Sequence, residues 1–188
     1  MQAAGFVLVG GRSSRMGRDK ALLPVKSGPL IKQLAAQVRV VAGRVALVGS
    51  PERYSNLGFD CLPDLRPGSG PLGGIESALS SQPGELNLIL ACDMPGIEAD
   101  FLSALLSEAA KTSGLCVAAK DGSGVVHPLC AVYRNGCLPY VQDALAAGRL
   151  RLLDLLQDLK ARSFETGTIL SNINTPQDWR AWQEHQPV

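Results

Sequence analysis

Residues 6–20 read FVLVGGRSSRMGRDK. The first four form an apolar run typical of a buried strand, and the glycines that follow allow a tight turn that brings backbone N–H groups close to a bound anion. Successive N–H groups in such a turn form a concavity that suits phosphate oxygens. Arg12, Arg15, Arg18 and Lys20 add positive charge to it. The stretch therefore predicts a strand that leads into a polyphosphate-binding loop, the alternative being an ordinary glycine-rich turn whose basic residues are only solvated.

This loop is not a Walker A motif, which requires Gly-x-x-x-x-Gly-Lys-Ser/Thr. The spacing from Gly11 to Gly17 is one residue too long, and Asp19 precedes the lysine, so we do not expect a P-loop NTPase. Residues 68–73, GSGPLG, match Gly-x-Gly-x-x-Gly, but no good strand directly precedes them and Pro71 interrupts the turn. We interpret them as a chance match to the dinucleotide fingerprint.

The length and composition predict one domain, residues 1–188, with a well-buried core. A net charge of +1 argues against nucleic acid or an anionic membrane as partner. No apolar run approaches 18 residues, and the first residues lack the pattern of a signal peptide. The five cysteines have no Cys-x-x-Cys spacing. They are expected to be free thiols of a cytoplasmic protein rather than zinc ligands.

Strand-like and helix-like segments alternate along the chain. The strand-like segments are 6–9, 45–48, 61–62, 86–92, 115–119 and 125–133, the last interrupted at His127-Pro128. The helix-like segments are 30–41, 72–79, 101–109, 137–147 and 151–160, followed by a helix capped by Thr175 and Asp178. The alternation predicts a three-layer α/β sandwich, with a mostly parallel sheet and helices on both faces. Ligands of such sheets bind beyond the carboxyl ends of the strands.

An acidic residue stands at such a position. Asp93 directly follows the apolar run 86–92, and Pro95-Gly96 turns the chain away behind it. Carboxylates beside nucleoside triphosphates commonly hold Mg²⁺ together with phosphate oxygens and water. The alternative is that Asp93 only caps the following turn, as Asp often does. Asp64 is a second candidate, and for this residue turn formation and ligand contact are equally good interpretations.

These residues together resemble a known family, the molybdenum cofactor guanylyltransferases of the nucleotidyltransferase superfamily. The resemblance spans nearly the whole chain and rests on LVGGRSSRMG at 8–17 with Lys20, Asp64, GPLGG at 70–74, CDMP at 92–95, HP at 127–128 and NINTP at 172–176. It implies a Rossmann-like fold in which the N-terminal half binds GTP and the C-terminal half binds the acceptor. The implied reaction transfers GMP from Mg-GTP to the terminal phosphate of molybdenum-molybdopterin cofactor and releases pyrophosphate.

The resemblance also implies roles for single residues. Nucleotide contacts fall to Leu8, Val9, Gly10, Gly11, Lys20, Ser50, Asp64 and Asp93, and Asp93 also holds Mg²⁺. Ser50 stands where the family has Asn, and Val9 where Ala is usual. Related cytidylyltransferases carry Ala in place of Gly10, so the Gly10-Gly11 doublet favours GTP over CTP.

Catalysis of this kind needs positioning and charge neutralisation more than a strong base, because a phosphomonoester is already mostly ionised at pH 7. Arg15, Lys20 and Asp93 are the expected catalytic residues. Acceptor contacts are expected from His127, Asn174, Arg149 and Arg151, although His127 also suits a packing role at a strand end. Proteins that deliver or receive the cofactor are further expected partners.

Two alternatives remain open from the sequence. One is another nucleotidyltransferase, which uses CTP on the same cofactor or acts on a different acceptor such as a sugar phosphate. The other is a non-catalytic nucleotide-binding module. The presence of both Lys20 and Asp93 argues against the module, since binding alone does not require a metal carboxylate.

Overall fold

The computed structural model describes residues 2–10, 19–25, 28–81 and 84–184. Its elements are, in chain order, β1 (Ala3–Leu8), η1 (Lys20–Leu22), β2 (Pro24–Val25), β3 (Gly28–Pro29), α1 (Leu30–Ala42), β4 (Val45–Val48), α2 (Pro51–Tyr54), η2 (Ser55–Leu57), β5 (Asp60–Leu62), α3 (Gly70–Ser80), β6 (Leu86–Ala91), α4 (Ala99–Lys111), β7 (Cys116–Lys120), β8 (Val126–Arg134), η3 (Asn135–Cys137), α5 (Leu138–Ala146), α6 (Leu152–Asp158), β9 (Arg162–Glu165) and α7 (Pro176–Glu184).

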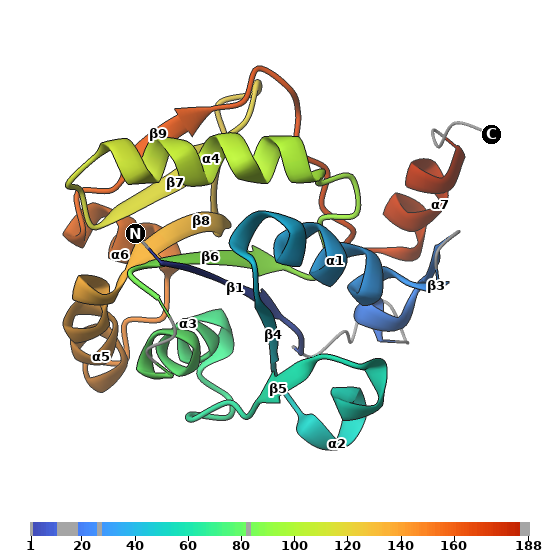
Figure 1. The fold of residues 1–188 in the computed structure, drawn as a ribbon, viewed down its shortest axis with the longest axis horizontal. Helices are drawn as coiled ribbons and strands as arrows, with labels where there is room; N and C mark the ends of the chain where they lie inside the picture. The colour runs from blue at the N-terminus through green and yellow to red at the C-terminus, as the bar shows by residue number, and fades with distance from the viewer. Residues whose placement is uncertain (1, 11–18, 26–27, 82–83, 185–188) are drawn as a thin grey trace.

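A seven-stranded sheet of order β5-β4-β1-β6-β8-β7-β9 forms the centre of the molecule. Its pairings are parallel except for those of β8, which runs antiparallel to both β6 and β7. Helices α1 and α4 cover one face of the sheet, and α3, α5 and α6 cover the other (Figure 1). The predicted three-layer α/β architecture is therefore confirmed.

The alternation of side chains along the strands builds two cores. On β1, Val7 faces the layer of α1 and α4, whereas Phe6 and Leu8 face α3 and α5. Successive strand residues point to opposite faces of a sheet, so a strand covered on both sides is apolar throughout. All six residues of β6 are buried, which explains its continuous apolar sequence.

Two expectations about the strands are wrong. The segment 125–133 is not interrupted at Pro128, because β8 runs unbroken from Val126 to Arg134. The pairing of β8 with β7 shifts register between Ala118 and Ala119, and Pro128 lies within that irregularity. A proline is tolerated there because a bulge leaves a ladder position unpaired. The sequence analysis also missed β9, a short edge strand.

The helix ends follow their sequence signals. At the start of α7, the Thr175 hydroxyl accepts a hydrogen bond from the Asp178 N–H, and the Asp178 carboxylate accepts one from the Thr175 N–H. This is the reciprocal capping box that the sequence predicted. Within the described part of the chain, no helix has both the length and the apolar character needed to cross a membrane.

Candidate functional site

Strand register brings four of the predicted site residues into one row. The parallel pairings align the last residues of β5, β4, β1 and β6, which are Leu62, Val48, Leu8 and Ala91. Two residues beyond these strand ends stand, in the same order, Asp64, Ser50, Gly10 and Asp93. We call these four positions the nucleotide edge. They lie at the carboxyl ends of parallel strands, where ligands of such sheets bind.

Lys20 connects this edge with the C-terminal part of the chain. Its Nζ donates a hydrogen bond to Asn174 Oδ1 at 2.9 Å and lies 4.0 Å from Asp93 Oδ2. The Lys20 side chain is 16% exposed, although it belongs to a segment predicted to be a loop. Three residues far apart in the sequence therefore meet at one place: the Lys20 amine, the Asp93 carboxylate and the Asn174 amide.

Asp93 combines partial burial with access to solvent. Its side chain is 25% exposed. Burial raises the pKa of the Asp93 carboxyl, while the positive charge of Lys20 acts in the opposite direction. A carboxylate that has lost part of its hydration gains from a nearby cation. The position is thus suited to a cationic partner.

The segment before α7 is attached directly to this site. The Ile173 N–H donates to the Asp93 backbone carbonyl at 2.8 Å, and Ile173 itself is buried. Asn174 follows at once, which places its amide against Lys20. Figure 1 shows α7 beyond the edge where the parallel strands end. The Ile173 hydrogen bond therefore ties the segment that carries the predicted site residue Asn174 to Asp93.

The start of the phosphate loop is shaped by close backbone contacts. Leu8 and Val9 are buried, the Val9 N–H donates to the Val48 carbonyl, and a Cβ on Gly49 would collide with the Val9 carbonyl oxygen. Gly10 has a φ of +118°, a conformation that L side chains rarely adopt. The chain therefore needs glycine where it leaves β1. Gly11 and Arg15 lie outside the described residues.

Ser50 and Asp64 bond to near neighbours in the sequence. The Ser50 hydroxyl donates to Glu52 at 2.6 Å, and Asp64 Oδ1 accepts from the Arg66 N–H at 2.9 Å. The second contact is the turn-forming role considered for Asp64 from the sequence. Both side chains stand on the nucleotide edge, and their contacts to nucleotide stay predictions.

His127 lies in a separate buried network around Asp121. His127 Nε2 is 3.0 Å from Asp121 Oδ2, and both residues are buried. The other Asp121 oxygen accepts hydrogen bonds from the Ser123 N–H, the Ser123 hydroxyl and the Val125 N–H. These hydrogen bonds lower the pKa of the Asp121 carboxyl, with Ser123 the largest cause and His127 next. The network fixes the His127 ring on β8, beside the strand β6 that leads to Asp93.

The two arginines proposed for acceptor binding pair with α6. Arg149 bonds to Asp158 at 2.6 Å, and Arg151 lies 3.8 Å from Asp154. Both pairs are substantially exposed. The structure thus joins Asn174 to Lys20 and Asp93, whereas each arginine is engaged with a carboxylate of α6.

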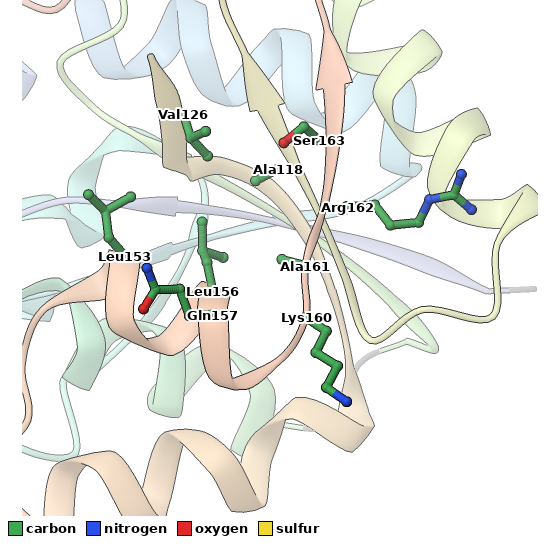
Figure 2. A pocket seen from close by; sticks show the side chains of 9 residues that line it. All are labelled: Ala118, Val126, Leu153, Leu156, Gln157, Lys160, Ala161, Arg162 and Ser163. Carbon is green, nitrogen blue, oxygen red and sulfur yellow. The ribbon is translucent and has the colours of Figure 1, made fainter. Parts of the chain in front are cut away.

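Figure 2 shows a pocket elsewhere, between α6 and strands β7, β8 and β9. Its lining contains none of the predicted site residues. The Arg162 side chain extends away from it and donates to Thr112 Oγ1 at 3.2 Å. The walls that remain are largely aliphatic, so this pocket offers little to hold a triphosphate.

Sequence reasoning missed Asp121 and gave Asp19 no role. Asp121 directly follows β7 just as Asp93 closely follows β6, and that signal was available. Asp19 accepts a hydrogen bond from the buried Tyr54 hydroxyl at 2.7 Å. No feature of the sequence identifies Tyr54 as its partner, because the two residues are brought together only by the fold.

The cysteines follow the expectation in part. All five are free. Cys116, Cys130 and Cys137 are buried, whereas Cys61 and Cys92 are partly buried. Burial raises the pKa of the Cys130 and Cys137 thiols to about 12, which keeps both protonated at neutral pH.

Comparison with known proteins shows which family the chain resembles. A family model described as the MobA-like NTP transferase domain matches residues 5–162. A relative from Flavobacterium johnsoniae, named "Probable molybdenum cofactor guanylyltransferase", is 36% identical over 80% of this chain and 78% of its own length. The "Molybdenum cofactor guanylyltransferase" of Serratia proteamaculans is 29% identical over 98% of this chain and 96% of its own.

Solved structures show the same fold. A molybdopterin-guanine dinucleotide biosynthesis protein A from Archaeoglobus fulgidus superposes with a TM-score of 0.83 at 23% identity, covering 96% of this chain and 97% of its own. A CMP:2-keto-3-deoxy-manno-octonic acid synthetase complexed with CTP gives 0.73 at 14% identity, with 97% of each chain covered. From the family match and the level of identity, this chain belongs to the MobA-like NTP transferase family.

Proposed function

We propose that the protein transfers GMP from Mg-GTP to the terminal phosphate of molybdenum-molybdopterin cofactor, with release of pyrophosphate and formation of the guanine dinucleotide cofactor. The observation that carries this proposal is the meeting of Lys20, Asp93 and Asn174 at the end of the register-aligned nucleotide edge. The names of the curated relatives support it.

The reaction forms one P–O bond and breaks another. An oxygen of the acceptor phosphate attacks the α-phosphorus of GTP, and the bond to pyrophosphate breaks. The attacking oxygen is already anionic at neutral pH, so no side chain must remove a proton. The chain has to hold the two substrates in line and neutralise charge.

In this proposal Lys20 neutralises triphosphate charge, since its amine stands beside Asp93 at the strand end. The backbone amides of residues 10–17 and the Arg15 guanidinium hold the same phosphates. Leu8, Val9 and Gly10 supply the close backbone wall, and Ser50 and Asp64 face the nucleoside from the neighbouring strand ends.

The Asp93 carboxylate fits a magnesium ion. It is a hard oxygen donor of the kind that Mg²⁺ prefers, and it is partly exposed. Within the described residues, no cluster of three or more His, Cys, Asp or Glu side chains could hold a metal without help. The donor set therefore suits an ion that arrives with the triphosphate. When bound, Mg²⁺ supplies charge neutralisation on the phosphate oxygens.

The acceptor is placed on the side of Asn174 and His127. Asn174 already touches Lys20, and His127 is held by Asp121 on the other side of Asp93 from β1. Arg149 and Arg151 can contact the acceptor in this proposal only if they first separate from their carboxylate partners on α6.

The preference for GTP rests on Gly10. Without a Cβ this position leaves space for the larger purine base, whereas related cytidylyltransferases carry Ala there. The proposal places the protein in the cytoplasm, with proteins that deliver or receive the cofactor as partners.

The test is pyrophosphate release with purified molybdenum-molybdopterin cofactor, Mg²⁺ and each of the four nucleoside triphosphates. The expected result is cofactor-dependent release with GTP that exceeds the release with CTP, ATP and UTP. Equal or faster pyrophosphate release with CTP would mean that the protein is a cytidylyltransferase and not a guanylyltransferase. Binding of GTP with no release under any condition would favour a nucleotide-binding module.

A further inference from the structure

A buried hydrogen bond links α2 to the turn that carries Lys20. The Tyr54 hydroxyl donates to Asp19 Oδ2 at 2.7 Å. Tyr54 is 1% exposed and belongs to the core formed with α1 and α4. Burial, followed by the Asp19 carboxylate, raises the pKa of Tyr54 well above its ordinary value. The hydroxyl therefore keeps its proton and remains a donor to Asp19.

The other oxygen of Asp19 organises the turn itself. Asp19 Oδ1 accepts a hydrogen bond from the Ala21 N–H at 3.1 Å, which makes Asp19 the N-cap of η1. Its backbone carbonyl accepts from the Leu22 N–H at 3.2 Å. Lys20 is the first residue of η1. The orientation of the Asp19 carboxylate thus sets the direction in which the Lys20 side chain leaves the backbone.

Tyr54 is the stronger of two anchors on this carboxylate. Arg53, its neighbour on α2, places a guanidinium nitrogen 3.9 Å from the same Oδ2, but its side chain is 63% exposed. Exposed ion pairs at that distance contribute little to a fixed geometry. A short hydrogen bond from a buried, conformationally fixed ring is a more effective restraint.

The helix that carries Tyr54 begins at the nucleotide edge. Ser50 is the N-cap residue of α2 and lies two residues beyond the end of β4. The path from Ser50 through Tyr54 and Asp19 to Lys20 therefore joins the strand end expected to face the nucleoside to the amine expected to meet the phosphates. The hydrogen bonds of this path, from Tyr54 to Asp19 and from the Ala21 N–H to Asp19, both lie within the described residues.

We propose that Tyr54 and Asp19 are a positioning pair that holds Lys20 for nucleotidyl transfer without touching substrate. This inference rests on the proposed function for its effect on turnover, but the geometry of Lys20 is measurable without any substrate. Neither residue forms or breaks a bond in the reaction.

The first measurement is the rate at which Lys20 reacts with an amine acylating reagent, mapped by mass spectrometry in the substrate-free protein. Tyr54→Phe removes only the hydroxyl, so Lys20 should react several-fold faster than in the wild type. Lys111, whose side chain is 74% exposed, should react at an unchanged rate. Unchanged Lys20 reactivity in Tyr54→Phe would overturn the inference, whatever reaction the protein catalyses.

The second measurement is turnover in a double-mutant cycle. Tyr54→Phe should lower kcat about tenfold, which corresponds to one well-placed hydrogen bond. In the Lys20→Ala background the same change should have no further effect, because the group that it positions is gone. An equal loss in both backgrounds would mean that Tyr54 acts through general stability, and it would overturn the positioning role.

Tyr133→Phe is the matched control. Tyr133 is also fully buried, belongs to the core on the opposite face of the sheet, and donates its hydroxyl to the Pro128 carbonyl at 2.8 Å. The melting temperature of Tyr133→Phe should fall by about as much as that of Tyr54→Phe. Its Lys20 reactivity should be unchanged, and its kcat should stay within twofold of wild type.

A wild-type protein that transfers no GMP would contradict the proposed function alone, since the acylation measurement still decides the inference.

Discussion

The two sides of the site are held in place in different ways. Along the nucleotide edge, strand register sets the positions, and the polar side chains bond within their own turns, as Ser50 does with Glu52. On the proposed acceptor side, the buried Asp121 accepts hydrogen bonds from its own loop, from His127 on β8 and, at 3.4 Å, from the Leu170 N–H. A regular sheet positions ligand groups with few added bonds, whereas long loops need a buried polar centre.

The Lys20 contact with Asn174 joins these two sides. If the two sides of the site are held in these different ways, changes on the nucleotide edge should reduce transfer with little loss of folding stability. Changes in the Asp121 network should alter acceptor binding and stability together.

The largest effect is expected for Asp93→Asn. The variant keeps size and a neutral oxygen but loses the charge that favours Mg²⁺, so turnover should fall by about two orders of magnitude or more. Magnesium-dependent pyrophosphate release measures this, with thermal melting as the control for folding. Wild-type turnover in a normally folded variant would make Asp93 a turn residue.

Lys20→Ala should lower turnover by about 10²-fold, because it removes a charge from the developing transition state. The lysine is mostly buried and bonded to Asn174, so a stability loss of about 1 kcal/mol should accompany it. Steady-state kinetics and denaturant unfolding measure the two effects. An unchanged rate would exclude this lysine from the mechanism.

Asp121→Asn tests the acceptor side. The amide cannot accept at both oxygen positions, so His127 loses its fixed partner, and KM for the cofactor should rise about tenfold while KM for GTP stays unchanged. A rise in KM for GTP alone would contradict the assignment of Asp121 to the acceptor side of the site.

The same variant has a signature in the pH dependence of stability. The folded-state pKa of Asp121 lies below the ordinary value near 4. Its stabilising contribution is therefore complete above that ordinary pKa and is lost as the pH falls toward the folded-state value. Between pH 5 and 3, the wild type should lose more melting temperature than Asp121→Asn does. Parallel melting curves over this range would contradict the assignment.

The smallest effect is expected for Thr175→Ala. Loss of the N-cap hydroxyl of α7 should cost about 1 kcal/mol, or roughly 2–4 °C in melting temperature for a domain of this size. Turnover should change less than twofold, because Ile173 remains bonded to the Asp93 carbonyl. A large loss of turnover would show that the cap itself positions Asn174.

The nucleotide edge was more predictable from sequence than the acceptor side, for physical reasons. Apolar runs identify strands buried on both faces, and the residue after such a run reaches the ligand edge, which is how Asp93 was found. On the proposed acceptor side, β8 contains Pro128 within a register irregularity, and β9 is a mostly exposed edge strand with almost no apolar signal. Local patterns do not specify either feature.

Contacts between distant segments were also beyond the sequence. Lys20 and Asn174 are 154 residues apart, and Tyr54 and Asp19 are 35 residues apart. Both pairs depend on how α2, η1 and the segment before α7 come together around the sheet. The types of the site residues were predictable, whereas the partners that fix them depend on tertiary packing.

The most direct test of the central claim follows the α-phosphorus of GTP. Protein, Mg²⁺, molybdenum-molybdopterin cofactor and GTP labelled at the α-phosphate are incubated together, and the label is located after separation of cofactor, nucleotide and pyrophosphate. The account predicts label in the cofactor, in amounts equal to the pyrophosphate released, for the wild type and about a hundredfold less for Asp93→Asn. Label that stays entirely with free guanine nucleotides, with an unlabelled cofactor, would contradict it.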